Sequence, residues 1–227
     1  MDERAFAAAR ERMVREHLQA RDIFDLRVLE VMRRVPRHRF VPPEAAAEAY
    51  EDRPLPIGQE QTISQPLMVA LMAQMLKLTG CERVLDVGTG SGYGAAVLAE
   101  LTREVITVER HAALGEQARV RLAELGYTNV TVRIGDGSEG YAAAAPYDRI
   151  HVAAASPRVP EALIAQLAPE GRLIIPVGEP GLQTLTVITK DSAGRAFTHE
   201  HGGCAFVPLI GAQGWPNDPG QQSNSEF

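Results

Sequence analysis

The feature that most constrains this chain is a run of closely spaced glycines directly after a short apolar segment. Residues 84–94 read Val-Leu-Asp-Val-Gly-Thr-Gly-Ser-Gly-Tyr-Gly. Glycine lets a ligand lie against the backbone, and a turn that begins a helix offers the unpaired amide groups of the helix N-terminus. The segment therefore predicts a strand, a ligand-binding turn and a helix, which together start an open α/β sheet.

Strand-like and helix-like patterns alternate along the chain after residue 83. Strands are expected at 84–87, 105–108, 130–134, 150–152, 173–177, 185–188 and 204–209, and helices at 93–101, 113–125 and 160–167. This alternation predicts an α/β fold with a doubly wound, mostly parallel sheet and helices on both faces. The last two strands have no helical pattern between them, so we expect them to pair antiparallel at one edge.

The first part of the chain has a different pattern. Residues 3–35 carry apolar side chains at near-helical spacing and are expected to be helical until Pro36. Residues 37–66 contain five prolines and one short alanine-rich helix, which indicates a connecting region with functional loops. An apolar helix at 67–78, ended by Gly80, then leads into the sheet.

These patterns divide the chain into three parts. We expect an N-terminal helical extension with a substrate-side loop at 1–66, an α/β domain at 67–211 and a flexible tail at 212–227. The tail is expected to be flexible because its Gly, Gln, Asn, Pro and Ser residues resemble those of mobile chain ends.

Composition argues against several classes of protein. The net charge of −6 disfavours a nucleic-acid binder, which needs a basic face to displace counterions from phosphates. No apolar run approaches the roughly 20 residues of a membrane span, and the charged start Met1-Asp2-Glu3-Arg4 lacks the apolar core of a signal peptide. The two isolated cysteines fit a reducing compartment. We therefore expect a cytoplasmic monomer with no nucleic-acid or membrane partner.

A metal site is considered at His199, His201 and Cys204. Alternate residues of a strand share one face, so the two histidine rings could lie together. Nothing else in the sequence supplies a fourth ligand, and we expect no metal.

Asp86 favours one class of nucleoside cofactor over another. A dinucleotide is an alternative, because Gly90, Gly92 and Ala95 fit the looser G-x-G-x-x-A pattern. The carboxylate of Asp86, two residues before the first glycine, would repel a pyrophosphate but suits the cationic methionine end of S-adenosylmethionine. The turn residues expected to contact this cofactor are Gly88, Thr89, Gly90 and Ser91.

Two further strand ends carry acidic side chains. Glu109 ends the second strand about 20 residues after the glycines, where a carboxylate can accept the ribose hydroxyls of either cofactor; we expect Arg110 beside it to contribute as well. Asp136 and Gly137 end the third strand at the same edge of the sheet. Asp136 could accept a hydrogen bond from the adenine amino group, although an ordinary Asp-Gly turn would leave the same pattern.

Three separated segments carry a resemblance to a known family. Residues 135–150 read Gly-Asp-Gly-Ser-Glu-Gly-Tyr-Ala-Ala-Ala-Ala-Pro-Tyr-Asp-Arg-Ile, and 58–66 read Gly-Gln-Glu-Gln-Thr-Ile-Ser-Gln-Pro. Residues 206–209 read Phe-Val-Pro-Leu. In order and spacing these segments resemble the protein-L-isoaspartate O-methyltransferase family over roughly residues 13–209, and the first meets every fixed position of the family signature.

The resemblance implies a fold and an activity. The fold is the Rossmann-like, seven-stranded sheet of class I S-adenosylmethionine-dependent methyltransferases, with an N-terminal helical extension and an atypical order of the last two strands. The activity is methylation of the free carboxylate of L-isoaspartyl residues in damaged proteins and peptides, which yields S-adenosylhomocysteine. The ester closes to a succinimide, whose hydrolysis partly restores the normal aspartyl linkage.

The resemblance also implies which residues face the substrate. Ser64 matches the active-site serine of the family and is expected to hydrogen-bond the isoaspartyl carboxylate, with Thr62 and Gln65 in support. No general base is expected, because a carboxylate with a pKa of about 4 is already ionised at neutral pH. The segment around Val207 is expected either to accept an extended peptide through main-chain hydrogen bonds or to be a plain core strand.

Other activities remain open at this point. A methyltransferase of the same fold could act on an aspartate carboxylate of a modified peptide natural product. A binding module without catalysis could keep the fold, and a nicotinamide oxidoreductase could use the glycine turn. Asp86, Glu109, Asp136 and Ser64 argue against the binding module. The family signature at 135–150 argues against the oxidoreductase.

Overall fold

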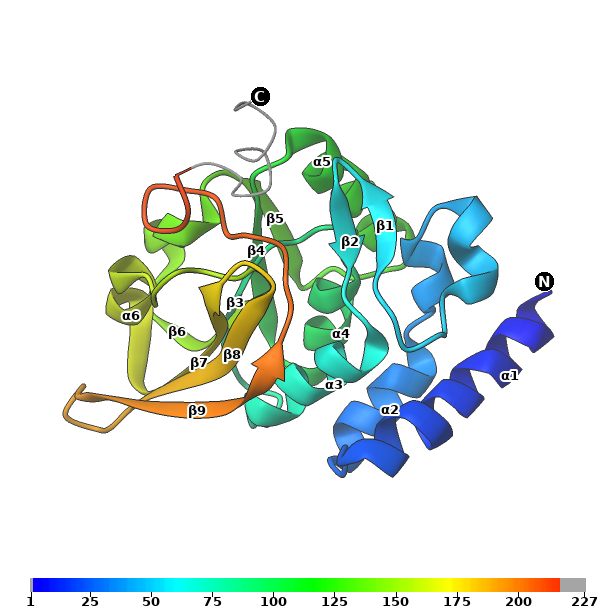
Figure 1. Ribbon diagram of the computed structural model, residues 1–227, viewed down its shortest axis with the longest axis horizontal. Coiled ribbons are helices and arrows are strands. Elements are labelled where there is room, and N and C mark those ends of the chain that lie inside the picture. Colours follow the sequence, from blue (N-terminus) through cyan, green and yellow to red (C-terminus); the bar gives the residue numbers. More distant parts are fainter. Residues whose placement is uncertain (1, 217–227) are drawn as a thin grey trace.

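The computed structural model describes residues 2–216 and is built around a seven-stranded sheet in the order β5-β4-β3-β6-β7-β8-β9 (Figure 1). The strands are β3 (Arg83–Val87), β4 (Glu104–Glu109), β5 (Val130–Ile134), β6 (Tyr147–Val152), β7 (Leu167–Glu179), β8 (Leu182–Lys190) and β9 (Ala196–Cys204). Strands β3 to β7 pair in parallel, whereas β8 and β9 are antiparallel to their neighbours. The predicted α/β class, mostly parallel sheet and antiparallel edge are therefore confirmed.

Successive residues of β3 point to opposite faces of the sheet and join two apolar cores. Val84 packs in a core with α3 (Pro66–Met75), α4 (Tyr93–Leu101), α5 (Ala112–Glu124) and the N-terminal helices. Leu85 packs in the other core with Leu163 of α6 (Glu161–Gln166). Both faces of a parallel sheet must be covered by helices, and these two cores satisfy that requirement.

The N-terminal helical stretch is not continuous, which corrects the prediction for residues 3–35. Helix α1 (Glu3–Met13) continues into a π-turn at Val14–Leu18 and a 3-10 turn at Gln19–Arg21, and α2 (Leu26–Arg34) starts anew. Asp22 has a φ of 66°, a left-handed conformation that Asp tolerates better than most residues. Asp25 then caps α2, because its carboxylate accepts from the Arg27 and Val28 amides.

Residues 37–66 contain more regular structure than the prolines predict. The alanine-rich segment is a 3-10 helix (Pro43–Glu48), and a second 3-10 helix covers Arg37–Phe40. A hairpin follows, made of β1 (Leu55–Gly58) and β2 (Gln61–Ile63). The hairpin was not predicted, because its strands are only three and four residues long.

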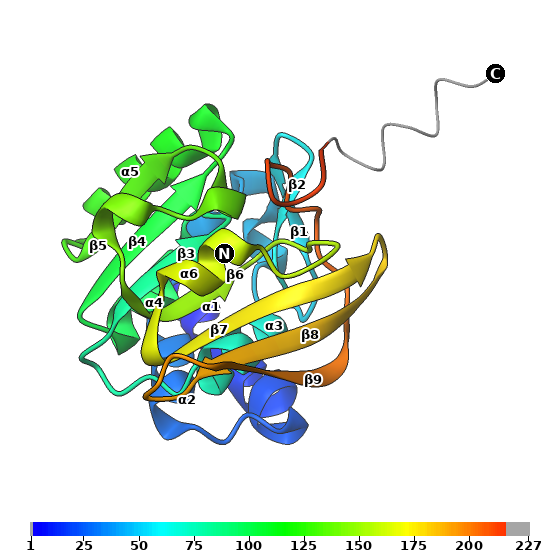
Figure 2. The same ribbon diagram turned by 90° about the vertical axis from the view of Figure 1, so that its left-hand side faces the viewer.

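The last strand lies earlier in the chain than predicted. It was expected at 204–209, but β9 ends at Cys204, and residue 208 makes only an isolated bridge to Ala155. Strand β9 is exposed along nearly all its length, so it has no apolar alternation to reveal it. Strands β7 and β8 also extend beyond their predicted ends and form a long twisted hairpin (Figure 2).

The predicted boundary at residue 211 is not where the packed chain ends. Residues 211–216, here called the C-terminal turn, are held by hydrogen bonds from the Ala212 amide to Asp136 and from the Gln213 amide to Ser138. The remainder of the predicted tail, residues 217–227, lies outside the described residues. Within residues 2–216, no helix has the length and apolar character needed to cross a membrane.

A buried arginine joins the N-terminal extension to the sheet. The Nε atom of Arg37 donates to the Ala49 carbonyl at 2.7 Å, and its guanidinium lies 4.9 Å from the ring centre of Tyr93 in α4. Burial lowers the pKa of Arg37 to about 10, so the side chain remains charged at neutral pH. Segments on both sides of residue 66 thus share one core.

Glu82 organises the turn that leads into β3. Its carboxylate accepts hydrogen bonds from the Thr79 amide and hydroxyl and from the Gly80 and Cys81 amides, at 2.8–3.1 Å. Burial opposes ionisation of this group, but the hydrogen bonds outweigh it and lower the pKa of Glu82 below its usual value. The ionised side chain therefore stabilises the turn.

We expect Glu82→Gln to lower the free energy of unfolding at pH 7 by about 1–3 kcal/mol, because an amide cannot accept all of these bonds. A lowered folded-state pKa contributes stability that is present above the unfolded pKa and is lost as the pH falls through the folded value. The difference between variant and parent should therefore shrink below about pH 4. Urea unfolding across this range checks it, with the exposed Glu124→Gln as control; a constant difference down to pH 2.5 would contradict it.

Candidate active site

A cavity of about 530 Å³ lies at the carboxyl end of β3, β4 and β6. It is bounded on one side by the glycine turn and on the other by the tip and second strand of the β1–β2 hairpin and by residues 206–210. In an open α/β sheet, ligands bind at this end of the strands. The predicted site residues that line the cavity are Thr62, Ser64, Asp86, Gly88, Thr89, Gly90, Ser91, Glu109, Arg110, Gly137 and Val207.

The glycine turn explains why glycine recurs at every second position. Gly88, Gly90 and Gly92 have φ angles of 94°, 52° and 91°, which L-residues with a side chain rarely adopt. Gly92 is the N-cap residue of α4, and the Gly88 amide donates to the Val108 carbonyl at 2.9 Å. The turn therefore folds back onto β4 and keeps its backbone next to the cavity.

Asp86 lies at the bottom of the cavity in a buried chain of hydrogen bonds. Its Oδ1 atom is 2.7 Å from Nδ1 of His151, and its Oδ2 atom accepts from the Thr107 hydroxyl at 2.7 Å. The Thr107 oxygen is also 2.6 Å from the Thr89 oxygen. Thr107 and His151 are the direct neighbours of Asp86 on β4 and β6. Neither residue was predicted at the site, because this proximity depends on the register between strands.

Glu109, at the end of β4, holds the glycine turn through a hydrogen bond to a backbone amide. One carboxylate oxygen accepts from the Gly90 amide at 2.8 Å and the other from the His111 amide at 2.9 Å. Each oxygen has a second lone pair, so the carboxylate can still accept a pair of hydroxyl groups from a ribose. Arg110 and His111 also line the cavity, and His111 was not predicted.

Asp136 is not brought into the cavity with the other acidic residues. One of its oxygens accepts from the amide and hydroxyl of Ser138, and the other accepts from the Ala212 amide. Its neighbour Gly137 does line the cavity. In this structure the carboxylate therefore holds the C-terminal turn, and a contact with adenine stays a prediction.

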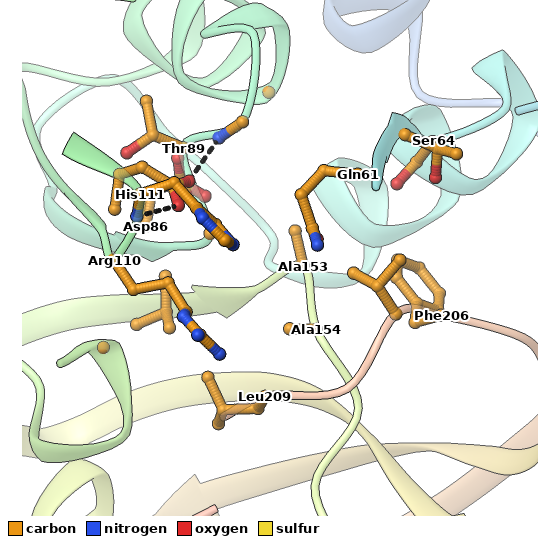
Figure 3. A pocket seen from close by; sticks show the side chains of 18 of the residues that line it. Gln61, Ser64, Asp86, Thr89, Arg110, His111, Ala153, Ala154, Phe206 and Leu209 are labelled. Atoms are coloured by element: carbon orange, nitrogen blue, oxygen red, sulfur yellow. Dashed lines mark hydrogen bonds between the residues drawn. The ribbon is translucent and has the colours of Figure 1, made fainter. Parts of the chain in front are cut away.

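Ser64 and the cofactor-side residues lie on opposite sides of the cavity. Figure 3 shows Ser64 and Phe206 facing Asp86 and Thr89 across the space into which Gln61 projects. Ser64 follows β2 and precedes α3, so the hairpin and the helix together fix its position. Gln65 does not line the cavity; its amide nitrogen lies 3.5 Å from Asp52.

The segment 206–209 forms a wall of the cavity and is not a strand of the main sheet. The Val207 carbonyl accepts from the Ala155 amide at 2.8 Å, and the Leu209 amide donates to the Ala155 carbonyl at 2.7 Å. The Phe206 amide donates to the side chain of Gln183. The expectation of a plain core strand is therefore wrong, whereas pairing with a peptide stays a prediction.

The tip of the β1–β2 hairpin adds residues that were not predicted at the site. Gln59, Glu60 and Gln61 all line the cavity. Gln59 and Glu60 have φ angles of 52° and 57°, the left-handed values that a two-residue hairpin turn requires. The pattern Gly-Gln-Glu-Gln gives no strong hairpin signal, because such turns favour Asn and Gly at these positions.

Comparison with known proteins identifies the family. Residues 8–214 match the family model described as protein-L-isoaspartate(D-aspartate) O-methyltransferase (PCMT). The chain belongs to this family. Among its relatives are proteins named protein-L-isoaspartate O-methyltransferase 2 from Geotalea uraniireducens, 54% identical over 92% of this chain and 97% of that protein, and protein-L-isoaspartate O-methyltransferase from Methylorubrum extorquens, 56% identical over 90% and 89%.

Solved structures of the family have the same fold. One named protein-L-isoaspartate O-methyltransferase has a TM-score of 0.80 and 28% identity, covering 96% of this chain and 71% of its own. Another, from Plasmodium falciparum, is described as a beta-aspartate methyltransferase (PCMT) in complex with S-adenosyl-L-homocysteine. It has a TM-score of 0.77 and 28% identity, covering 88% of this chain and 98% of its own. The predicted class I methyltransferase fold is therefore confirmed.

We expect Glu109→Ala to weaken binding of S-adenosylhomocysteine at least about tenfold, because hydrogen bonds to a charged group contribute about 1.5–3 kcal/mol. The change also leaves the Gly90 and His111 amides without their acceptor. Titration calorimetry measures the affinity, with the exposed Glu124→Ala as control. An affinity within twofold of the parent would show that Glu109 does not hold the ribose.

Proposed function

We propose that this protein transfers the methyl group of S-adenosylmethionine to the free carboxylate of L-isoaspartyl residues in proteins and peptides. The observation that carries the proposal is one cavity lined by the glycine turn, Asp86 and Glu109 on one side and by Ser64 on the other. The relatives over most of the chain are named for this activity. The nicotinamide reading is not favoured, because the family match covers residues 8–214.

The reaction needs orientation and a water-poor site more than it needs a base. A carboxylate oxygen attacks the methyl carbon, the carbon–sulfur bond breaks, and its electron pair stays on sulfur, which becomes the neutral thioether of S-adenosylhomocysteine. The attacking carboxylate is ionised at neutral pH. The cavity contributes by holding the two reactants in line and by limiting access of water.

Ser64 supplies the hydrogen-bond donor for the acceptor carboxylate in this proposal. Its hydroxyl stands across the cavity from the glycine turn, so it can orient one carboxylate oxygen toward the methyl group. Thr62 lines the same wall. Gln65 lies outside the cavity and acts indirectly, through the contact of its amide nitrogen with the carboxylate of Asp52. Val207 and its neighbours offer main-chain groups to an extended peptide, which would tolerate many different side chains.

The wider setting follows from the same proposal. The methyl ester closes to a succinimide, so the product leads to repair of the damaged linkage. Residues 1–66 contribute Thr62 and Ser64 to the substrate-side wall, whereas 67–211 contribute the glycine turn on the cofactor side and residues 206–210 on the substrate side. We further propose a cytoplasmic location, which the two free cysteines support, and no nucleic-acid partner, which the acidic net charge supports. The proposal also takes the protein to be a monomer without a membrane partner.

The alternative substrate, an aspartate in a modified peptide natural product, is not favoured by the relatives, which are named for isoaspartate. A methyl-transfer assay with an isoaspartyl peptide and its normal aspartyl twin tests this directly. We expect at least a hundredfold higher kcat/KM for the isoaspartyl peptide. Equal rates would reject the proposal, and absence of transfer to both, with intact cofactor binding, would reject it too.

We expect Ser64→Ala to lower kcat/KM for an isoaspartyl peptide by about tenfold to a hundredfold, because one donor to the acceptor carboxylate is lost. Affinity for S-adenosylhomocysteine should stay within twofold, since Ser64 lies on the substrate side. Ser192→Ala, at an exposed position, serves as the matched control. An unchanged kcat/KM would remove Ser64 from the mechanism.

A further inference from the structure

His151 is a cavity residue for which the family resemblance gave no role. It lies on β6 beside Asp86 of β3, and its side chain is only 7% exposed while still lining the cavity. Among residues 2–216, no lysine or arginine forms an ion pair with Asp86. The buried carboxylate therefore depends on hydrogen bonds from His151 and Thr107.

The contact with Asp86 determines which nitrogen of the ring carries the proton. An ionised carboxylate can only accept hydrogen bonds, so Nδ1 of His151 must be the donor in the 2.7 Å contact. In a neutral imidazole the other nitrogen, Nε2, is then an acceptor. No donor within residues 2–216 reaches it.

The ring of His151 lines the cavity and lies close to the helix that follows the glycine turn. A Cβ atom placed on Gly94, in the first turn of α4, would have Cε1 of His151 as its nearest neighbour at 4.0 Å. Cε1 stands between the two ring nitrogens, so the edge of the ring that runs from Nδ1 to Nε2 lies near the start of α4. The methionine end of the methyl donor is expected next to this turn, and its ammonium group needs acceptors.

We propose that His151 binds the methyl donor: Nδ1–H fixes the carboxylate of Asp86, and Nε2 accepts a hydrogen bond from the donor's α-ammonium group. Asp86 and His151 then hold the methionine end as a pair, with the ring neutral. A protonated ring could not do this, because both nitrogens would be donors and its charge would oppose the ammonium. The inference rests on S-adenosylmethionine being the donor.

Three variants separate the roles of the two nitrogens. His151→Leu removes both, while His151→Asn keeps an amide N–H close to the position of Nδ1 and removes Nε2. His151→Gln places its amide group near the position of Nε2 instead. We expect the Leu variant to raise the Kd for S-adenosylhomocysteine and the KM for the donor at least tenfold. The kcat and the KM for the peptide should change less than threefold.

The Asn variant should recover the stability of the parent in urea unfolding but keep an affinity at least fivefold weaker, and Gln should recover part of that affinity. His199→Leu, on exposed β9, is the matched control. Affinities within twofold of the parent for all three variants would overturn the proposal. Full recovery of affinity by Asn would also overturn it, because Nε2 would then have no role.

Nitrogen NMR of the unmodified protein provides a test that needs no variant. We expect the His151 ring to be the neutral Nδ1–H tautomer, and its Nε2 signal to shift when S-adenosylmethionine is added at saturation. A saturated complex with an unshifted Nε2 signal overturns the inference alone. Failure of the unmodified protein to bind the donor at all would instead reject the proposed function.

Discussion

Asp86 lies near the carboxyl end of β3, between two parallel neighbours, with only 1% of its surface exposed. A carboxylate at such a depth is costly unless hydrogen-bond donors reach it, and Thr107 and His151 supply them from the two neighbouring strands. The strand register places these three side chains in one row, so the sheet itself builds the bottom of the cavity. The rest of the site is arranged above that row.

The glycine turn and Glu109 form the next layer of the site. The positive φ angles of its glycines let the turn fold back beside Asp86, Thr107 and His151. The hydrogen bond from the Gly90 amide to Glu109 holds the turn against the end of β4. Two distant parts of the chain then complete the walls, the β1–β2 hairpin and residues 206–210. The site therefore needs the N-terminal extension packed on the sheet, a contact to which Arg37 contributes.

Much of the fold could be predicted because its elements carry strong local signals. The helix at Tyr93–Leu101 and the strand at Val130–Ile134 lie where they were predicted, since the first is an apolar run that directly follows the glycine turn and the second is rich in β-branched residues. The exposed strand β9 and the short hairpin were missed because neither has a long apolar pattern. The break between α1 and α2 was missed because the apolar residues before and after it keep a near-helical spacing. Only Asp22 and Asp25, which end one helical segment and cap the next, mark the break.

The glycine turn, the acidic strand ends and the family signature are recognisable in the sequence alone, because each depends on residues that are near one another in the chain. The contacts of the acidic groups depend on the folded chain: Asp86 pairs with His151, Glu109 with two backbone amides, and Asp136 with the C-terminal turn. The same holds for the position of Ser64 across the cavity from Asp86. These contacts join residues up to 76 positions apart, and strand register and helix packing, which no local pattern encodes, bring them together.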